Sequence, residues 1–266
     1  MALGRKLVWD AIGTREYETG TKDVVLFVQN SSGAYSNGVA WSGCTGVSEN
    51  PSGAESTKIY ADDIAYLNLI SAEEFAATIT AYMYPPEFDE CNGVASIAKG
   101  VSIGQQSRRP FGLAYTTTIG NDTDNTDYGY KIHLVYNGTA AVSNKEYKSI
   151  NNDPDAIEFS FDISTTPVKI DGYKPTATLV INSTVVDAKK LKEFEEILYG
   201  KDPELLKESP ADWSTNWKNY VEKKAGEYVL IDSVTAPEFE TGKYYAPGVE
   251  SRLMLPDEVA AFFAEG

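Results

Sequence analysis

The residues best suited to chemistry in this chain are one histidine, His133, and two cysteines, Cys44 and Cys91. A histidine-based hydrolase would need a nucleophile beside the base, and no G-x-S-x-G or comparable setting accompanies the stretch KIHLVY around His133. A zinc site would need the histidine, both cysteines and a carboxylate, but their positions lack ligand-pair spacing. The sequence therefore predicts no enzyme and no metal site, and it favours a histidine at a surface or interface.

The acidic residues do not form a catalytic or cofactor-binding pattern either. Asp122, Asp124 and Asp127 lie in the polar stretch GNDTDNTD, which lacks the sixth-position glycine and the terminal glutamate of an EF-hand loop. Neighbouring carboxylates such as Asp62-Asp63 point to opposite faces of a strand, whereas a glycosidase needs two that face each other. We expect solvated acids and no cofactor.

The charge balance argues against a nucleic-acid-binding surface. The chain has 39 acidic residues against 23 lysines and arginines, a net charge of −16. Proteins that grip nucleic acid neutralise phosphates with clustered basic residues. The basic doublet Arg108-Arg109, which precedes Pro110, is the only one between residues 60 and 185. We expect it to face an acidic surface of a neighbouring subunit.

Length and composition favour one β domain with an elaboration. The 266 residues are 42% hydrophobic and 12% aromatic, which allows a core and leans towards sheet. No apolar run approaches the ~18 residues of a membrane span, and MALGRKLVWD lacks the apolar region of a signal peptide. We therefore expect no membrane association, a cytoplasmic origin and two free thiols.

Alternating apolar residues and turn signals predict a series of strands. Leu113–Ile119 and Tyr128–Tyr136 bracket a polar tip, which predicts a hairpin with a long acidic loop over Gly120–Asp127. Asn50-Pro51-Ser52-Gly53 predicts a turn. The other predicted strands cover 24–29, 39–47, 56–60, 75–83, 157–163 and 177–182.

Two helices are expected in the second half of the chain. The first covers Ala188–Tyr199, with Asp187 as N-cap and Gly200 just past the end. Its apolar residues Leu191, Phe194 and Leu198 form one stripe at helical spacing. The second covers about 210–224, where Ser209 and Asp212 form a capping box around Pro210. A further strand is expected at 228–234.

Several segments, in this order, resemble the major tail proteins that form the tube of long non-contractile phage tails. They are AWSGCTGVSENPSGAESTKIYADD (40–63), EFAATITAYMYPPEF (74–88), GQQSRRPFGLAYTT (104–117), GYKIHLVYN (129–137), LKEFEEILYG (191–200) and LMLPDEVAAFF (253–263). None is specific by itself, and the resemblance is carried by the ordered set. It implies a mainly β, α+β fold: an antiparallel β-sandwich or barrel subunit flanked by a helix.

The resemblance also implies a function and a division of the chain. Residues 1–200 would form the tail tube domain and 251–266 a C-terminal arm. Many members of the family run almost directly from the helix end to the closing segment, so 201–250 is expected to be an insertion. Six copies would join edge to edge into a ring, and the rings would stack into a virion tube through which DNA passes without specific binding.

Partners and contacts follow from the same resemblance. They are other copies of the chain, the tape measure protein, the tail terminator and distal tail proteins, with assembly in the host cytoplasm. An acidic lumen wall would repel the duplex, and Asp122, Asp124 and Asp127 are candidates for it. Leu253, Leu255, Phe262 and Phe263 are candidates for contacts between rings.

Two alternatives remain open from the sequence. A carbohydrate-binding β-sandwich would use the many tyrosines and tryptophans, and it predicts a monomer with exposed aromatic residues in a row. The inner tube of a contractile tail or injection machine would share the fold. An enzyme is the least favoured of the four readings.

Overall fold

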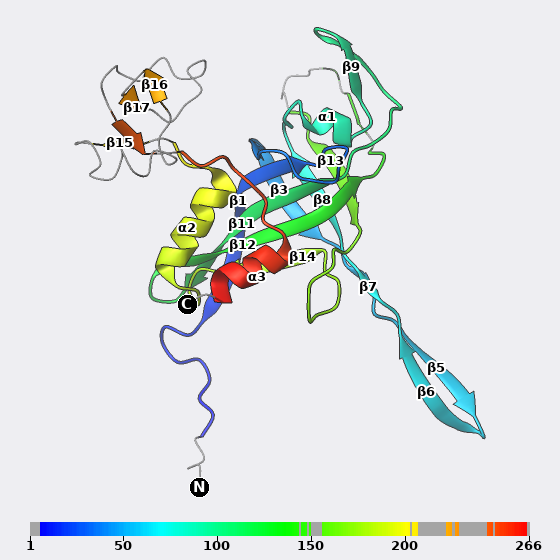
Figure 1. Cartoon of the computed structure of the whole chain (residues 1–266). Coiled ribbons are helices and arrows are strands. Elements are labelled where there is room, and N and C mark those ends of the chain that lie inside the picture. Colours follow the sequence, from blue (N-terminus) through cyan, green and yellow to red (C-terminus); the bar gives the residue numbers. More distant parts are fainter. Residues whose placement is uncertain are drawn as a thin grey trace. The chain divides into compact units, whose positions relative to one another are not determined.

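The computed structural model describes residues 6–143, 145–147, 149, 156–202, 204–206, 222–224, 227–228, 244–246 and 248–264. The chain divides into two compact units, one formed by Met1–Ala188 with Met254–Gly266 and the other by Lys189–Leu253. The fold is mainly β and antiparallel, with few helices, as predicted (Figure 1). No described helix is both long and apolar enough to cross a membrane.

The first unit is built on one antiparallel sheet with the strand order β2-β1-β11-β12-β13-β8-β3, and β14 pairs with β12. The sheet strands are β1 (Glu16–Val28), β2 (Val39–Ala40), β3 (Cys44–Glu49), β8 (Ala76–Ala81), β11 (Phe111–Asn121), β12 (Asn125–Ala140), β13 (Phe159–Thr165) and β14 (Thr178–Asn182). Outside it lie β4 (Ser52–Gly53), β5 (Ser56–Ala61), β6 (Ile64–Ile70), β7 (Glu73–Glu74), β9 (Ala95–Ala98), β10 (Val101–Ile103), and the helices α1 (Phe88–Cys91) and α3 (Pro256–Ala264).

The long strand β12 divides the sheet into two halves. Its C-terminal end pairs with β13 at Gly138–Ala140, and its middle pairs with β14 at Lys131–Val135. Alternation sends Ile79 and Ala81 of β8 to the interior, with Thr78 and Thr80 on the other face. The half with β13, β8 and β3 folds over β1, β11 and β12 and encloses the core.

Aromatic side chains fill this core. Phe88 of α1 lies 4.6 Å from Trp41 and 4.9 Å from Phe161, measured between ring centroids. The Trp41 indole N–H donates to the Met83 carbonyl at 2.9 Å, so its one polar group is satisfied. Burying each such side chain is worth roughly 1.5–3 kcal/mol relative to exposure. The predicted strand 39–47 is interrupted here, because Trp41 turns inward and Gly43 has a φ of +74°.

The closing segment packs on the opposite face of β12. Ile132, Leu134 and Tyr136 of β12 are fully buried, and the Tyr136 hydroxyl donates to the Met254 carbonyl at 2.9 Å. Val259 of α3 is also buried. Pro256 fits the first turn, and the Glu258 carboxylate accepts from the Leu255 N–H at 2.8 Å, as in half of a capping box.

Two predicted turns are wrong. The predicted long loop 120–127 is a tight turn of Asp122–Asp124, because the strands continue to Asn121 and restart at Asn125. The Asn121 side chain accepts from the N–H groups of Thr123 and Asp124, which satisfies the turn locally. The chain also does not reverse at 50–53: it reverses at Asp62-Asp63, where φ is +51° and +61°.

The second unit contains α2 (Ala188–Tyr199), β15 (Glu204–Leu206), β16 (Glu222–Lys224), β17 (Glu227–Tyr228) and β18 (Tyr244–Ala246). The predicted helix 188–199 is confirmed, and its apolar stripe is buried. β15 pairs with β18, and β16 pairs with β17. Of the predicted helix 210–224, residues 222–224 form β16 and the rest lies outside the described residues. Of the predicted strand 228–234, only Tyr228 is described, at the end of β17.

Candidate assembly surface

The half of the sheet formed by β1, β11, β12 and β14 has two open edges. β2 pairs with β1 only at Val25 and Leu26, which leaves the outer edge of Glu16–Lys22 without a strand partner among the described residues. β14 lies at the other side, paired with β12 alone. Unpaired strand edges invite pairing with another chain unless they are blunted. This half-sheet therefore offers one pairing edge on each side.

The hydrogen-bond pattern shows which groups point outward from β14. Tyr136 N–H donates to Ala177 O at 2.8 Å, and Ser183 N–H donates to Tyr130 O at 3.0 Å. Because bonded pairs alternate along an antiparallel ladder, Leu179 and Ile181 bond to β12 and Val180 points its backbone groups away from it. Val180 is 51% exposed. Its N–H and C=O have no partner among the described residues.

One face of the same half-sheet carries a row of polar side chains. Lys131 pairs with Glu18 across β11, and Glu18 is also 3.5 Å from the Thr117 hydroxyl. The Thr117 hydroxyl lies 2.9 Å from His133 Nε2. His133 Nδ1 is 3.8 Å from Glu49, too far for a direct hydrogen bond. The row makes this face polar and mixed in charge, and a shallow depression over Glu16, Glu18, Ile119 and Asn182 adjoins it.

Burial decides how the two rings in this row titrate. Tyr115 stacks on His133 with ring centroids 4.7 Å apart, and its hydroxyl bonds to Glu49. Burial and the bond to Glu49 raise the Tyr115 pKa. Burial also lowers the His133 pKa, and the charges of Glu49 and Glu18 oppose that shift. Near neutral pH both rings are therefore uncharged parts of the sheet, and His133 is half-buried rather than a free surface group.

The three candidate lumen acids are exposed: Asp122 and Asp124 lie in the tight turn between β11 and β12, and Asp127 lies near the start of β12. Asp122 accepts from the Gly13 N–H at 2.9 Å and lies 3.8 Å from Arg15. Asp124 accepts from the Asn121 side chain at 3.1 Å, and the Asp127 N–H donates to the Asp124 carbonyl. The turn is thus tied by hydrogen bonds, and the Asp122 side chain is only 22% exposed.

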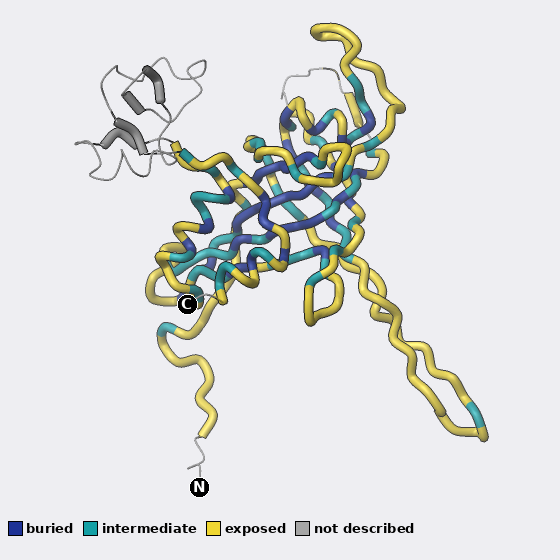
Figure 2. Tube along the Cα trace, viewed as in Figure 1, coloured by how far each residue is buried: buried dark blue, intermediate teal, exposed yellow. Residues whose placement is uncertain are grey.

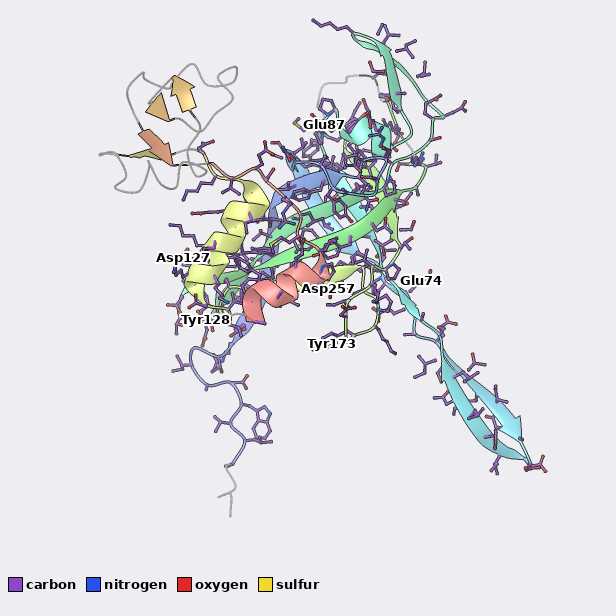
Figure 3. All side chains as sticks on the ribbon, viewed as in Figure 1. Glu74, Glu87, Asp127, Tyr128, Tyr173 and Asp257 are labelled. Carbon is purple, nitrogen blue, oxygen red and sulfur yellow. The ribbon has the colours of Figure 1, made fainter. Side chains whose placement is uncertain are left out.

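A second surface projects from the sheet as a two-stranded arm, defined here as residues 52–74. β4 pairs with β7 at its base and β5 with β6 along its length (Figure 1). Figure 2 shows the arm exposed almost throughout, and in Figure 3 Glu74 marks the place where it leaves the sheet. Its exposed apolar residues are Ile59, Tyr60, Ile64, Tyr66, Leu67, Leu69 and Ile70, each 41–68% exposed.

Half of this arm was not predicted from the sequence. A strand was predicted at 56–60 but none at Ile64–Ile70. The run IAYLNLI directly after Asp62-Asp63 could have predicted the second strand. Two residues that tolerate positive φ between apolar runs are typical of a hairpin. Large apolar side chains left in solvent on both strands are unusual for a monomer and mark an interaction surface.

The candidate basic pair, Arg108 and Arg109, makes contacts within its own chain. Arg108 donates to the Ala140 carbonyl at 2.5 Å, and Arg109 pairs with Glu90 at 3.0 Å. Arg109 keeps half of its side chain exposed. Arg109 is therefore the member that still offers charge to a neighbour.

The candidate inter-ring residues also differ in how much of each side chain is exposed to a neighbour. Leu253 is 2% exposed, so it packs within its own chain and offers no surface to another ring. Leu255 is 46% exposed. Phe262 and Phe263 are half-buried, with their ring centroids 5.2 Å apart. Leu255 is thus the candidate with the largest surface left for a neighbour.

The remaining reactive groups do not converge. Cys44 and Cys91 are both free, as predicted, and burial raises the pKa of Cys91 to about 12. Within the described ranges, no three histidine, cysteine, aspartate or glutamate side chains gather as a metal site would require.

Comparisons with known proteins gave the following. No protein-family model and no curated protein sequence matches this chain. A chain of a cryo-EM structure of an extracellular contractile injection system, the PVC sheath-tube complex in its extended state, matches at 11% identity and a TM-score of 0.29, covering 66% of this chain and 94% of its own. A chain of the cryo-EM structure of the anti-feeding prophage baseplate matches at 8% identity and a TM-score of 0.31, covering 66% and 97%. Similarity at this level establishes neither a shared fold nor a shared role.

Proposed function

We propose that this chain is a structural subunit that joins edge to edge into rings, and that the rings stack into a hollow tube of the phage-tail type. The observation that carries the proposal is the half-sheet β1-β11-β12-β14 with an open edge on each side. β1 of one copy pairing with β14 of the next is a head-to-tail contact, which generates a ring when the rotation closes. Closure would pair both open edges of this half-sheet and form a barrel.

The arm supports the stacking of such rings. A closed barrel has no free edge left for contacts along its axis, so stacking needs a second surface. The arm provides one, because burial in a contact would remove from water the part of its isoleucines, leucines and tyrosines that is now exposed. The gain for each is a fraction of the roughly 1.5–3 kcal/mol that full burial of a fully exposed apolar side chain contributes. The sequence resemblance adds the finer statements: six copies per ring, a long non-contractile tail, a tape measure, a terminator and distal tail proteins as partners, and DNA as the cargo.

The charge of the chain fits a conduit for DNA. With a net charge of −16, the protein would repel a duplex rather than hold it at each ring. We propose five acids for the lumen wall: Glu16 and Glu18 on the open half-sheet, Asp122 and Asp124 in its turn, and Asp127 near the start of β12. We also propose that the protein has no catalytic activity; turnover in a hydrolase screen that His133→Ala abolishes would contradict this.

A proline at the outer edge of β14 tests the ring contact directly. The Val180 N–H points away from β12, so Val180→Pro removes an outward donor and keeps the internal ladder, a position where strands tolerate proline. Val180→Thr keeps the N–H and serves as the matched control. By negative-stain microscopy we expect wild type and Val180→Thr to form rings or tubes of uniform width, and Val180→Pro to remain monomeric with an unchanged circular dichroism spectrum.

Two outcomes would count against the proposal. Tubes of normal width from Val180→Pro would show that β14 is not a pairing edge. A wild-type protein that stays monomeric at high concentration and binds glycans would refute the tube and favour the carbohydrate-binding module.

A further inference from the structure

A second exposed hairpin lies elsewhere in the first unit. β9 pairs with β10 through Ala98–Val101, Ser96–Ser102 and Ala95–Ile103. Side-chain alternation places Ala95, Ile97, Val101 and Ile103 on one face and the two serines on the other. Ile97 is 63% exposed, Val101 49% and Ile103 39%. The hairpin therefore presents an apolar face to solvent.

The arm also presents an apolar face. Ile59 pairs with Leu67, and Thr57 with Leu69, so these side chains share one face. Ser56 and Asn68, which are hydrogen-bonded to each other, lie on the other face together with Ile70, because Ile70 pairs with Ser56. Two-stranded hairpins are marginally stable in water unless another layer covers an apolar face. Both hairpins are exposed along their length, so neither covers the other within one chain (Figure 2).

The two hairpins are complementary in charge. The arm carries five acids, Glu55, Asp62, Asp63, Glu73 and Glu74, against Lys58, a net charge of −4 (one base minus five acids). Lys99 is the one charged residue of the β9–β10 hairpin itself, and Arg108 and Arg109 follow the hairpin with no acid between. Arg109 pairs with Glu90 but keeps half of its side chain exposed, so Lys99 is the main positive charge on the hairpin. Opposite charges steer two surfaces together and suppress wrong pairings.

We infer that the arm of one subunit packs on the β9–β10 hairpin of another copy of the chain, apolar face to apolar face, with the acids of the arm facing Lys99 and Arg109. This rests on the proposed self-assembly and names its second contact. The contact is head-to-tail, because the arm and the hairpin are different surfaces. It is separate from the β1–β14 edge contact, and each subunit would use both its arm and its hairpin.

Cysteine cross-linking between two single variants tests this pairing. Leu67→Cys in the arm and Ile97→Cys in the hairpin both replace exposed residues, so the fold should be kept. Cys91 is buried and Cys44 half-buried, so the wild-type protein treated alike is the background control. With a short bis-maleimide we expect a cross-linked dimer when the two variants are mixed and much less from either alone. The double variant should give a ladder of multimers.

Charge reversal at the hairpin turn provides the second measurement. Lys99→Glu should slow cross-linking of the mixed pair roughly two- to fivefold at low salt, as expected for an exposed ion pair, with the difference lost at high salt. Lys169→Glu makes the same charge change at an exposed lysine that pairs with Asp171, outside both hairpins, and should leave the rate unchanged.

The outcomes separate this inference from the proposed function. Tubes that form without any Leu67–Ile97 cross-link would refute the contact between the arm and the β9–β10 hairpin but would still support the proposed tube. A cross-linked pair from a protein that forms no rings or tubes would keep the pairing and overturn the tube. Dimers of Leu67→Cys with itself would instead show arm-to-arm packing and also refute the pairing.

Discussion

The hydrogen bond between the Tyr136 hydroxyl and the Met254 carbonyl makes it possible to test where the closing segment of the chain packs. Both groups are buried, at 2.9 Å, and they join the middle of β12 to the residues just before α3. Tyr136→Phe removes the hydroxyl and leaves the ring in place. The Met254 carbonyl then loses its partner in an environment that water does not reach.

The magnitude follows from the cost of a lost buried hydrogen bond. A typical bond contributes about 0.5–1.5 kcal/mol net, and an acceptor left buried and unpaired costs about 1–3 kcal/mol. We therefore expect Tyr136→Phe to lower the free energy of unfolding by about 1–3 kcal/mol, or the Tm by roughly 2 to 12 °C for a unit of this size. Urea denaturation followed by circular dichroism measures it, with an unchanged m-value as the sign that only stability changed.

Tyr173→Phe is the matched control, because Tyr173 is 79% exposed on a loop and loses nothing buried (Figure 3). We expect its effect to stay within about 0.5 kcal/mol. The sequence alone left open whether the closing segment packs on its own domain or on the next subunit. If Tyr136→Phe were as stable as Tyr173→Phe in the unassembled protein, the segment would not be docked on β12, and the assignment of Met254 and Val259 to this chain's own core would be refuted.

Two further predictions concern the arm and the buried thiol. Gly53 has a φ of +85°, and a Cβ there would lie 2.1 Å from the Ala72 carbonyl oxygen. Gly53→Ala should therefore destabilise the pairing of β4 with β7 at the base of the arm by about 1–3 kcal/mol. Amide exchange should rise at β4 and β7 but stay unchanged in Gly172→Ala, whose φ is similar and whose Cβ meets nothing within 4 Å. Burial raises the Cys91 pKa from 9.0 to about 12, so the unfolded thiol ionises first and stability falls as pH rises from 9 towards 12. Over this range the free energy of unfolding should fall by the order of 1 kcal/mol per pH unit, and in Cys91→Ala it should fall less steeply. Equal slopes in the wild type and Cys91→Ala, measured by urea denaturation at several pH values, would contradict the burial of Cys91.

Much of the sheet could be predicted from local pattern. Ala77, Ile79 and Ala81 alternate with threonines, and Phe161 and Ile163 alternate with polar residues, so one buried face fixes strand and orientation together. The helix 188–199 was predictable for the same reason, because Leu191, Phe194 and Leu198 recur at the helical period. Composition and charge also limited the function, since a single histidine and a net charge of −16 disfavour catalysis and nucleic-acid binding.

The arm and the short β11–β12 turn were not predictable in this way. Ile64–Ile70 has no buried face in the chain, so burial leaves no periodic signal in its sequence. The polar residues after Ile119 look like a loop, but the cross-strand ladder satisfies their backbone groups and carries the strands to Asn121 and Asn125.

Pattern and composition were enough to predict the strand-rich character of the chain, its free thiols and the types of residue available for contacts. Which of those residues remain exposed for a neighbour depends on how the chain folds. Leu253 and Leu255 are alike in sequence, yet one is buried and the other is 46% exposed. Arg108 and Arg109 are adjacent, yet Arg108 donates to Ala140 and Arg109 keeps half its surface. Burial and strand pairing depend on segments far apart in the chain. β1 and β14, for example, become the open edges of a half-sheet only because β11 and β12 lie between them.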